Sequence, residues 1–315
     1  MTQYDLIIIG GGASGLSAGV AALKDGVKKV LLLERNSDLG GNLNLFIHGG
    51  FGEYYFEKAV TGPELASELI KQFKALGGEY KIDTEVLELT TEKVVTYVNP
   101  REGIRDIKSN AIIIASGCRE KFTGNINIPI HKYTGIYTVV SAHKLINLYG
   151  YLPGKKVVIL GKTPWSLVLA IRLIVEGAKV NAIVNQHNNK QLNYRSEDIL
   201  RSMDINIIEH SRVIELYGSE RIEKIDVEDI IDKTITTIEC DSLILSVGYF
   251  PDLGFIKNTN IKIYDKKDTI VNNRTSEPGI FACGTVVTRD SEVFRSGEDG
   301  FKVGKLVAEY LNNFK

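Results

Sequence analysis

A glycine-rich turn near the amino terminus carries the residues whose types and spacing predict chemistry. Gly10, Gly12 and Gly15 form a Gly-x-Gly-x-x-Gly pattern directly after the apolar run 4–9. In such a turn the first glycine permits a sharp bend, the second lets backbone approach a phosphate, and the third lets the next helix pack closely on the strand. The helix beginning near Ala13 directs its unpaired N–H groups and positive dipole end at the phosphates. The pattern therefore predicts a site for the pyrophosphate of a dinucleotide.

An acid at a suitable distance completes the pattern. Glu34 ends the apolar run 30–33, 19 positions after Gly15. A carboxylate there accepts hydrogen bonds from ribose hydroxyls. A glycine turn alone is weak evidence, but this one is flanked by a strand, a helix and a correctly spaced acid. We predict dinucleotide binding by the turn, including Ser14 of the first helical turn; the alternative is a glycine turn with a structural role only.

The composition fits a soluble intracellular enzyme. Of 315 residues, 43% are hydrophobic and 24% charged, which suffices for two domains with their own cores. A net charge of −1 supplies no basic field for nucleic acid or an acidic membrane. The amino terminus does not read as a signal peptide, and no apolar run approaches the about 20 residues of a membrane span. Three scattered cysteines without a Cys-x-x-Cys pair argue against a disulfide framework, a zinc site and a dithiol redox centre. We therefore expect a cytoplasmic protein without a metal site.

The order of the expected elements indicates an α/β fold with two Rossmann-like domains. The strand–turn–helix–strand order of residues 4–34 recurs at 156–185. Thr61 and Glu64 predict a capping box that begins a helix. The other expected segments are strands at 85–91, 94–98, 103–108, 111–115, 242–247 and 279–283, an irregular stretch at 119–150 and a final helix at 296–313.

Four segments, spread over essentially the whole chain, resemble the flavoproteins with two dinucleotide-binding domains, of which thioredoxin reductase is the compact representative. These segments are the amino-terminal turn with Glu34, Ala115-Ser116-Gly117, Gly248-Tyr249-Phe250-Pro251, and the run from Thr275 to Gly284. The resemblance implies FAD as cofactor. It also implies a split FAD-binding domain, residues 1–118 plus 247–315, around an inserted NAD(P)-binding-like domain, residues 119–246.

A narrower resemblance concerns residues 39–52, 61–64 and 115–120. They look like a branch that includes the FAD subunits of bacterial amino-acid, opine and cyanide-forming dehydrogenases. The branch also includes small flavoproteins that accompany anaerobic-type glycerol-3-phosphate dehydrogenases. Its members generally lack the reductase dithiol, and Phe46 stands where many of them have cysteine. The resemblance implies a partner dehydrogenase subunit and a homodimer or hetero-oligomer.

The family resemblance also assigns further residues to the FAD site. It places their backbone or side chains along the adenosine, the pyrophosphate or the ribityl chain: Arg35, Gly41, Asn42, Val86, Ser116, Gly117, Gly284 and Thr285. At Thr285 the family commonly has aspartate, so a charge-assisted contact is lost and weaker flavin retention is expected. Cys118 is expected to be a small hydrophobe beside the cofactor and not a redox thiol.

His48 is the one acid–base candidate, because the family geometry places its glycine-rich loop near the flavin. Histidine moves protons near neutral pH. The alternative is a histidine hydrogen-bonded to backbone in that turn.

The second glycine turn lacks most of the Gly-x-Gly-x-x-Gly pattern. Only Gly161 of the pattern remains, Thr163 replaces the glycine that admits a phosphate, and the next strand ends at Asn185 instead of an acid. Lys162 is either a phosphate contact or a solvated lysine. The sequence therefore leaves open whether the residues of this turn bind NAD(P)H; they are Gly161, Lys162, Thr163 and Ser166.

These features predict an FAD-dependent oxidoreductase. Its electrons pass between flavin and NAD(P)H, or between flavin and a partner dehydrogenase subunit of the glycerol-3-phosphate, opine or amino-acid type. The alternatives are an enzyme like thioredoxin reductase without its own Cys-x-x-Cys, and a non-catalytic flavin-binding subunit.

Overall fold

The chain of the computed structural model divides into two units. Unit 1 comprises Met1–Arg119 and Tyr249–Lys315, and unit 2 comprises Glu120–Gly248. The second unit is thus an insertion in the first, and its ends lie within two residues of the expected 119 and 246. The structure describes residues 2–122, 132–186, 203, 205–264, 275–288 and 295–313. None of the helices among these residues is both long and apolar enough to traverse a lipid bilayer.

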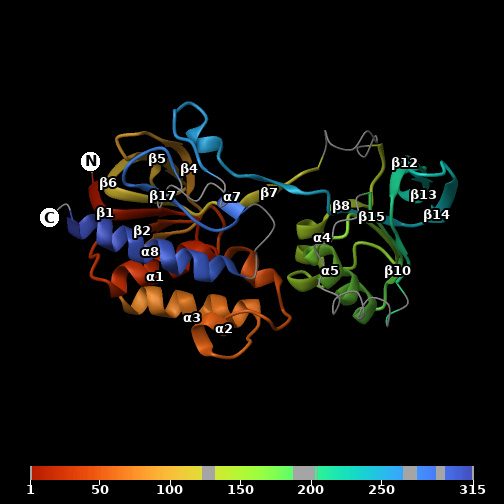
Figure 1. The fold of residues 1–315 in the computed structure, drawn as a ribbon, viewed down its shortest axis with the longest axis horizontal. Helices are drawn as coiled ribbons and strands as arrows, with labels where there is room; N and C mark the ends of the chain where they lie inside the picture. The colour runs from red at the N-terminus through yellow and green to blue at the C-terminus, as the bar shows by residue number, and fades with distance from the viewer. Residues whose placement is uncertain are drawn as a thin grey trace. The chain divides into compact units, whose positions relative to one another are not determined.

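Unit 1 is built on a mainly parallel sheet. Its strands are β1 (Thr2–Ile9), β2 (Val30–Leu33), β3 (Glu79–Lys81), β4 (Glu85–Leu89), β5 (Val94–Asn99), β6 (Gly103–Ile114) and β17 (Ile280–Ala282). The strand order is β3-β2-β1-β6-β5-β4, and β17 also pairs with β6. The helical segments are α1 (Ala13–Lys24), η1 (Gly41–Leu45), α2 (Glu53–Phe56), α3 (Gly62–Ala75), η3 (Gly254–Ile256), α7 (Thr285–Thr288) and α8 (Ser296–Asn313). Helices α1, α3 and α8 cover one face of the sheet (Figure 1). The other face carries an apolar core to which residues of β4, β5 and η3 contribute.

The expected strands 103–108 and 111–115 are one strand, β6. The polar pair Ser109-Asn110 between them does not end it, because the Ser109 hydroxyl is buried and donates to the Ala111 carbonyl at 2.6 Å. The first half of β6 pairs antiparallel with β5, and the second half pairs parallel with β1 and β17. The strand therefore joins the antiparallel part of the sheet to its parallel part. The predicted capping box at Thr61 and Glu64 is confirmed at the start of α3.

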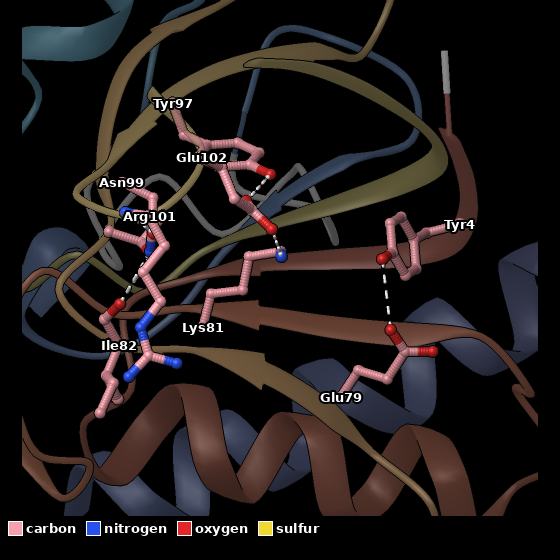
Figure 2. A network of polar contacts seen from close by, with 9 residues as sticks. Tyr4, Glu79, Lys81, Ile82, Tyr97, Asn99, Arg101 and Glu102 are labelled. Atoms are coloured by element: carbon pink, nitrogen blue, oxygen red, sulfur yellow. Dashed lines mark hydrogen bonds and ion pairs between the residues drawn. The ribbon is translucent and has the colours of Figure 1, made fainter. Parts of the chain in front are cut away.

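A polar network holds the edge strand β3 against the β5–β6 hairpin (Figure 2). The Lys81 ammonium lies 2.6 Å from the Glu102 carboxylate, which also accepts a hydrogen bond from the Tyr97 hydroxyl at 2.6 Å. The backbone carbonyl of Lys81 in turn accepts from the Glu34 N–H at 2.8 Å. The network thus fixes the strand that lies beside Glu34.

Unit 2 repeats the architecture on a smaller scale. Its parallel sheet has the order β11-β10-β9-β15-β8, and a separate antiparallel sheet has the order β12-β13-β14. The strands are β8 (Ile136–Thr138), β9 (Lys156–Leu160), β10 (Lys179–Val184), β11 (Ile207–Ile208), β12 (Ser211–Gly218), β13 (Ile222–Asp229), β14 (Ile235–Glu239) and β15 (Ser242–Leu245). Helices α4 (Val139–Asn147) and α5 (Pro164–Val175) lie against the parallel sheet, and residues of β12 and β13 complete an apolar core with it. The chain passes between the units along β7 (Cys118–Glu120) and β16 (Tyr249–Pro251), which pair with each other.

The prediction of an irregular stretch at 119–150 is wrong where the structure describes it. Strand β8 runs directly into α4, whose start is capped by the Thr138 hydroxyl. Val139, Ala142, His143 and Ile146 form its buried face, with the spacing of an amphipathic helix. Residues 123–131 of that stretch lie outside the described residues.

Glu120 makes the stability of unit 2 dependent on pH. Burial raises the pKa of this carboxyl above its ordinary 4.5, although it accepts hydrogen bonds from the Thr138 hydroxyl at 2.5 Å and the Val140 N–H at 2.8 Å. The folded state therefore binds the proton more tightly than the unfolded state. Stability contributed by this group is present below the unfolded pKa and is lost as pH rises through the folded pKa.

Replacing this carboxyl by an amide, Glu120→Gln, is expected to flatten the pH dependence of stability above pH 4.5 and to raise the melting temperature at pH 7 by up to about 3 °C. The amide oxygen can still accept from the Val140 N–H, and the amide N–H₂ can donate to the Thr138 hydroxyl, which then acts as the acceptor. Thermal unfolding across pH 4–8 measures the effect, with Glu220→Gln, at an exposed position of the same unit, as control. A variant that is less stable than wild type at pH 7 would contradict the assignment.

Candidate functional site

Three parallel strands of unit 1 bring the expected FAD residues to one edge of the sheet. Ile9 of β1 is the register partner of Ile114 of β6, which also pairs with Ala282 of β17. The turns that follow these strands therefore lie side by side at the carboxyl edge, where open α/β sheets bind ligands. Those turns contain Gly10, Gly12, Ser116, Gly117, Gly284 and Thr285.

The glycines of the first turn have separate physical roles. Gly10 has φ +108°, and a Cβ there would lie 2.4 Å from the Ala115 carbonyl oxygen. A Cβ on Gly15 would lie 1.9 Å from the Gly10 carbonyl oxygen, so only glycine lets α1 approach the turn. A Cβ on Gly12 would meet no atom of the described residues within 4 Å. Gly10 and Gly15 are thus required by the fold, whereas Gly12 faces open space at the start of α1.

The start of α1 offers its N–H groups to a ligand. Gly12 is its N-cap, and within the described residues no side chain caps this helix. In contrast, α3, α4 and α5 are each capped by a threonine hydroxyl. Uncapped N–H groups at a helix start form an anion site when a phosphate lies in front of them.

Glu34 is buried and held rigidly at the end of β2. Its carboxylate accepts hydrogen bonds from the Gly11 N–H at 2.7 Å, the Asn36 N–H at 2.8 Å and the Asn36 side-chain amide at 2.6 Å. This arrangement ties the acid to the glycine turn. A carboxylate has about four acceptor positions, so a ribose hydroxyl can still be accommodated.

The loop after β2 returns to the same turn. The Gly40 N–H donates to the Gly11 carbonyl at 2.8 Å, and Gly41 lies so close to Gly12 that a Cβ on it would be 3.0 Å from the Gly12 Cα. Asn42 is exposed beside it. The structure therefore brings the expected residues Gly41 and Asn42 to the first glycine turn.

The turn that follows β17 is the third turn at this edge of the sheet, and it is joined to α1 and α8. The Ser14 hydroxyl donates to the Ser296 carbonyl at 2.9 Å, so this hydroxyl serves the packing of α8. The Gly284 N–H donates to the Asp299 carboxylate at 2.7 Å, and the Cys118 thiol donates to the Thr285 carbonyl at 2.9 Å. Asp299 supplies a carboxylate near the position where Thr285 replaces the family's aspartate.

Asp252 is a site residue that the sequence analysis missed. Its buried carboxylate pairs with Arg35 at 2.5 Å and with Arg119 at 2.8 Å. Its backbone carbonyl accepts from the Ser116 hydroxyl at 2.7 Å, and its N–H donates to the Gly117 carbonyl at 3.0 Å. Asp252 therefore joins the loop after β2 to the turn after β6. The sequence feature that could have identified Asp252 is its position directly after the Gly248–Pro251 segment, which resembles the flavoprotein family.

Two expected residues lie apart from this edge or serve a different contact. Val86 lies on β4 and packs against the apolar core, so any contact with adenine is through its backbone. The Nδ1 of His48 donates to the Gly49 carbonyl at 2.8 Å, and its ring packs against Phe46 and Phe51 at centroid distances of 5.5 and 5.3 Å. This hydrogen bond to backbone is the alternative role that the sequence analysis gave for His48. A catalytic role for His48 stays a prediction.

The second glycine turn, between β9 and α5, is filled by side chains that the first turn lacks. Gly161 keeps φ +104°, and a Cβ there would lie 2.1 Å from the Ser246 carbonyl oxygen, as at Gly10. Thr163 caps α5 in a capping box with Ser166, and its hydroxyl lies 2.7 Å from that of Ser246. Lys162 is buried and ion-paired with Glu209 at 2.5 Å, so it is not the solvated lysine that one alternative described.

The residues of the first turn fit FAD. The glycine surface leaves room for a pyrophosphate, the start of α1 is uncapped within the described residues, and a buried carboxylate stands beside it. Among the described residues no group of three His, Cys, Asp or Glu side chains has the arrangement of a metal site.

Comparison with known proteins agrees with this fit. Residues 4–300 match the model of the pyridine nucleotide-disulphide oxidoreductases. Ferredoxin–NADP reductase of Halalkalibacterium halodurans is 26% identical over 92% of this chain and 87% of its own. Ferredoxin–NADP reductase 2 of Bacillus licheniformis is 28% identical over 92% and 86%. Among solved structures, thioredoxin reductase of T. acidophilum superposes with a TM-score of 0.81 at 20% identity, with all of both chains covered.

The chain therefore belongs to the pyridine nucleotide-disulphide oxidoreductase family and is an FAD-dependent oxidoreductase of the thioredoxin-reductase-like class. The predicted α/β fold with two Rossmann-like domains is confirmed by the structural match. The sequence analysis named thioredoxin reductase but not ferredoxin–NADP reductase, which is the name of several relatives.

Proposed function

We propose that this protein is an FAD-dependent reductase that exchanges electrons with a redox centre on a separate protein. The observation that carries the proposal is an FAD turn with its glycines and acid in place in a chain that has no dithiol. The cysteines at 118, 240 and 283 include no Cys-x-x-Cys pair. Burial raises the pKa of the Cys240 thiol to about 12, and Cys283 is fully buried. Direct reduction of a disulfide by two thiols of this chain is therefore not available to it.

The residues around the first turn perform the binding. Gly12 admits the pyrophosphate, the α1 N-terminus stabilises its charge, and Glu34 accepts from the adenosine ribose. Arg35, held by Asp252, lies beside this acid for the adenosine part. FAD bound there supplies the electron or hydride carrier, and the chain's own groups orient it.

Two kinds of protein partner are favoured by separate observations. The segment 39–52 resembles the FAD subunits of glycerol-3-phosphate, opine and amino-acid dehydrogenases, which favours a dehydrogenase subunit. The relatives named ferredoxin–NADP reductase favour a small iron–sulfur protein. Both observations favour a separate protein as the electron partner, and we propose that feature. We also propose that the chain works as a homodimer or as part of a hetero-oligomer.

The purified protein is expected to be yellow and to contain about one FAD per chain, because the first turn is complete. Dithionite should bleach it under anaerobic conditions. The bleached protein should then reduce added ferredoxin, or a co-purifying dehydrogenase with its substrate should bleach the oxidised protein. Visible absorbance measures each step. A colourless protein that takes up no added FAD would refute the proposal. So would a yellow protein that, when reduced, does not reduce ferredoxin and, when oxidised, is not bleached by a co-purifying dehydrogenase and its substrate.

A further inference from the structure

We infer that the second glycine turn, at the start of α5, does not bind a nicotinamide dinucleotide, because the chain's own side chains occupy the groups that would hold its pyrophosphate. This inference deepens the proposed function and rests on it only for the presence of FAD. It concerns the source of the electrons. The two turns of the same chain provide an internal comparison.

Two backbone donors at the start of α5 are already used, and a third is absent. The Thr163 N–H donates to the Ser166 hydroxyl at 2.8 Å, and the Ser166 N–H donates to the Thr163 hydroxyl at 3.2 Å. Pro164, between them, has no N–H. A phosphate would have to displace a capping box worth about 1 kcal/mol and would then find fewer donors than at α1.

The Thr163 side chain also stands where the first turn has open space. Thr163 takes the position of Gly12 in the pattern, and Gly12 has room for a Cβ that no described atom of the chain fills. The Thr163 hydroxyl lies 2.7 Å from the hydroxyl of Ser246, the residue after β15. This contact ties the turn to the end of the neighbouring strand and holds the Thr163 side chain in place.

The charged groups beside the turn satisfy one another. Lys162 is only 5% exposed, and its ammonium pairs with Glu209 at 2.5 Å. Asn185 occupies the strand-end position that Glu34 has in unit 1, and its amide also donates to Glu209, at 2.6 Å. Burial would raise the pKa of Glu209, but these hydrogen bonds lower it overall, so the carboxylate is ionised near neutral pH. The negative charge of Glu209 disfavours binding of a 2′-phosphate. Lys162 already pairs with Glu209 and does not offer its charge to a phosphate.

Titration of the full, FAD-loaded protein tests the inference. NAD⁺ and NADP⁺ are added in a calorimeter, and NADH and NADPH are added anaerobically while flavin absorbance is recorded. Dissociation constants above about 1 mM, or no saturation, are expected. No bleaching by either reduced nucleotide is expected, whereas dithionite bleaches the protein. Saturable binding below about 100 μM, or rapid bleaching, would overturn the inference. A colourless preparation would instead refute the proposed function.

A variant that reopens the turn tests the cause. Thr163→Gly combined with Pro164→Ala restores the space, frees the Ser166 N–H and supplies the N–H that proline lacks. This variant is expected to bind NAD⁺ at least about tenfold more tightly than wild type. Thr138→Gly, which removes the hydroxyl cap of α4 in the same unit, is the matched control and should not gain affinity. Ser166→Ala, which frees the Thr163 N–H, replaces the double variant if that variant fails to fold. A folded variant with its FAD retained and no gain in affinity would overturn the assignment to this turn.

Discussion

Gly12→Ala is expected to leave the protein folded and to weaken FAD binding at least about tenfold, a change of roughly 1.4 kcal/mol. Gly12 has φ −80° and ψ −169°, which alanine adopts without strain. Its Cβ would meet no described atom of the chain and would enter the space in front of α1. Fluorescence titration of flavin-free protein with FAD measures the affinity, and thermal unfolding of the same protein measures the fold.

Gly15→Ala should have the opposite profile. Its Cβ would lie 1.9 Å from the Gly10 carbonyl oxygen, so α1 must move from the turn at a cost of about 1–3 kcal/mol or more. Gly254→Ala in η3, where a Cβ meets no described atom within 4 Å, is the neutral control for both measurements. Unchanged FAD affinity in Gly12→Ala would show that the pyrophosphate does not lie at this turn.

Features that depend on short sequence distances were readable from the chain. The glycine spacing, the apolar runs on either side and the acid at the end of the next strand lie within 31 residues, from Tyr4 to Glu34. Each follows from a local steric or hydrogen-bonding requirement. The capping box of α3 is equally local, since Thr61 and Glu64 satisfy each other across one helical turn.

Features that depend on distant partners were not readable. Asp252 pairs with Arg35, 217 positions away, and nothing in the residues around either one specifies the other. The Lys162–Glu209 pair spans 47 positions, so the sequence left this lysine between a phosphate contact and solvent. Such pairings are created by the strand order, which brings the ends of β9, β10 and β11 together.

The antiparallel sheet β12-β13-β14 was missed for another reason. Strands β12 and β13 place buried residues between more exposed ones, which is close to the period-2 pattern of a half-buried strand, but register shifts interrupt it. Many exposed positions carry charge, and the strand β14 is mostly exposed, so the hydrophobic signal is weak. The pattern that indicates strands was therefore present locally, but the many polar residues obscured it.

Glu34→Ala is expected to raise the dissociation constant of FAD about a hundredfold or more, roughly 2.7 kcal/mol. The substitution removes the ribose acceptor and leaves the Gly11 N–H and two donors of Asn36 without the carboxylate that they now bind. Glu34→Gln should also weaken binding strongly, because one carboxylate oxygen becomes an N–H₂ group that faces other donors. Equilibrium titration with FAD and the flavin content of purified protein measure both variants.

Asn36→Ala separates the two roles of this carboxylate. It removes the side-chain amide that supports Glu34 and leaves the acid itself, so a loss of about threefold to tenfold is expected. If Asn36→Ala lost as much affinity as Glu34→Ala, the carboxylate would act by ordering the loop after β2 and not by binding the sugar. A small effect of Asn36→Ala beside a large effect of Glu34→Ala places the ribose on the acid, because the two variants disturb the same loop and only one removes the acceptor.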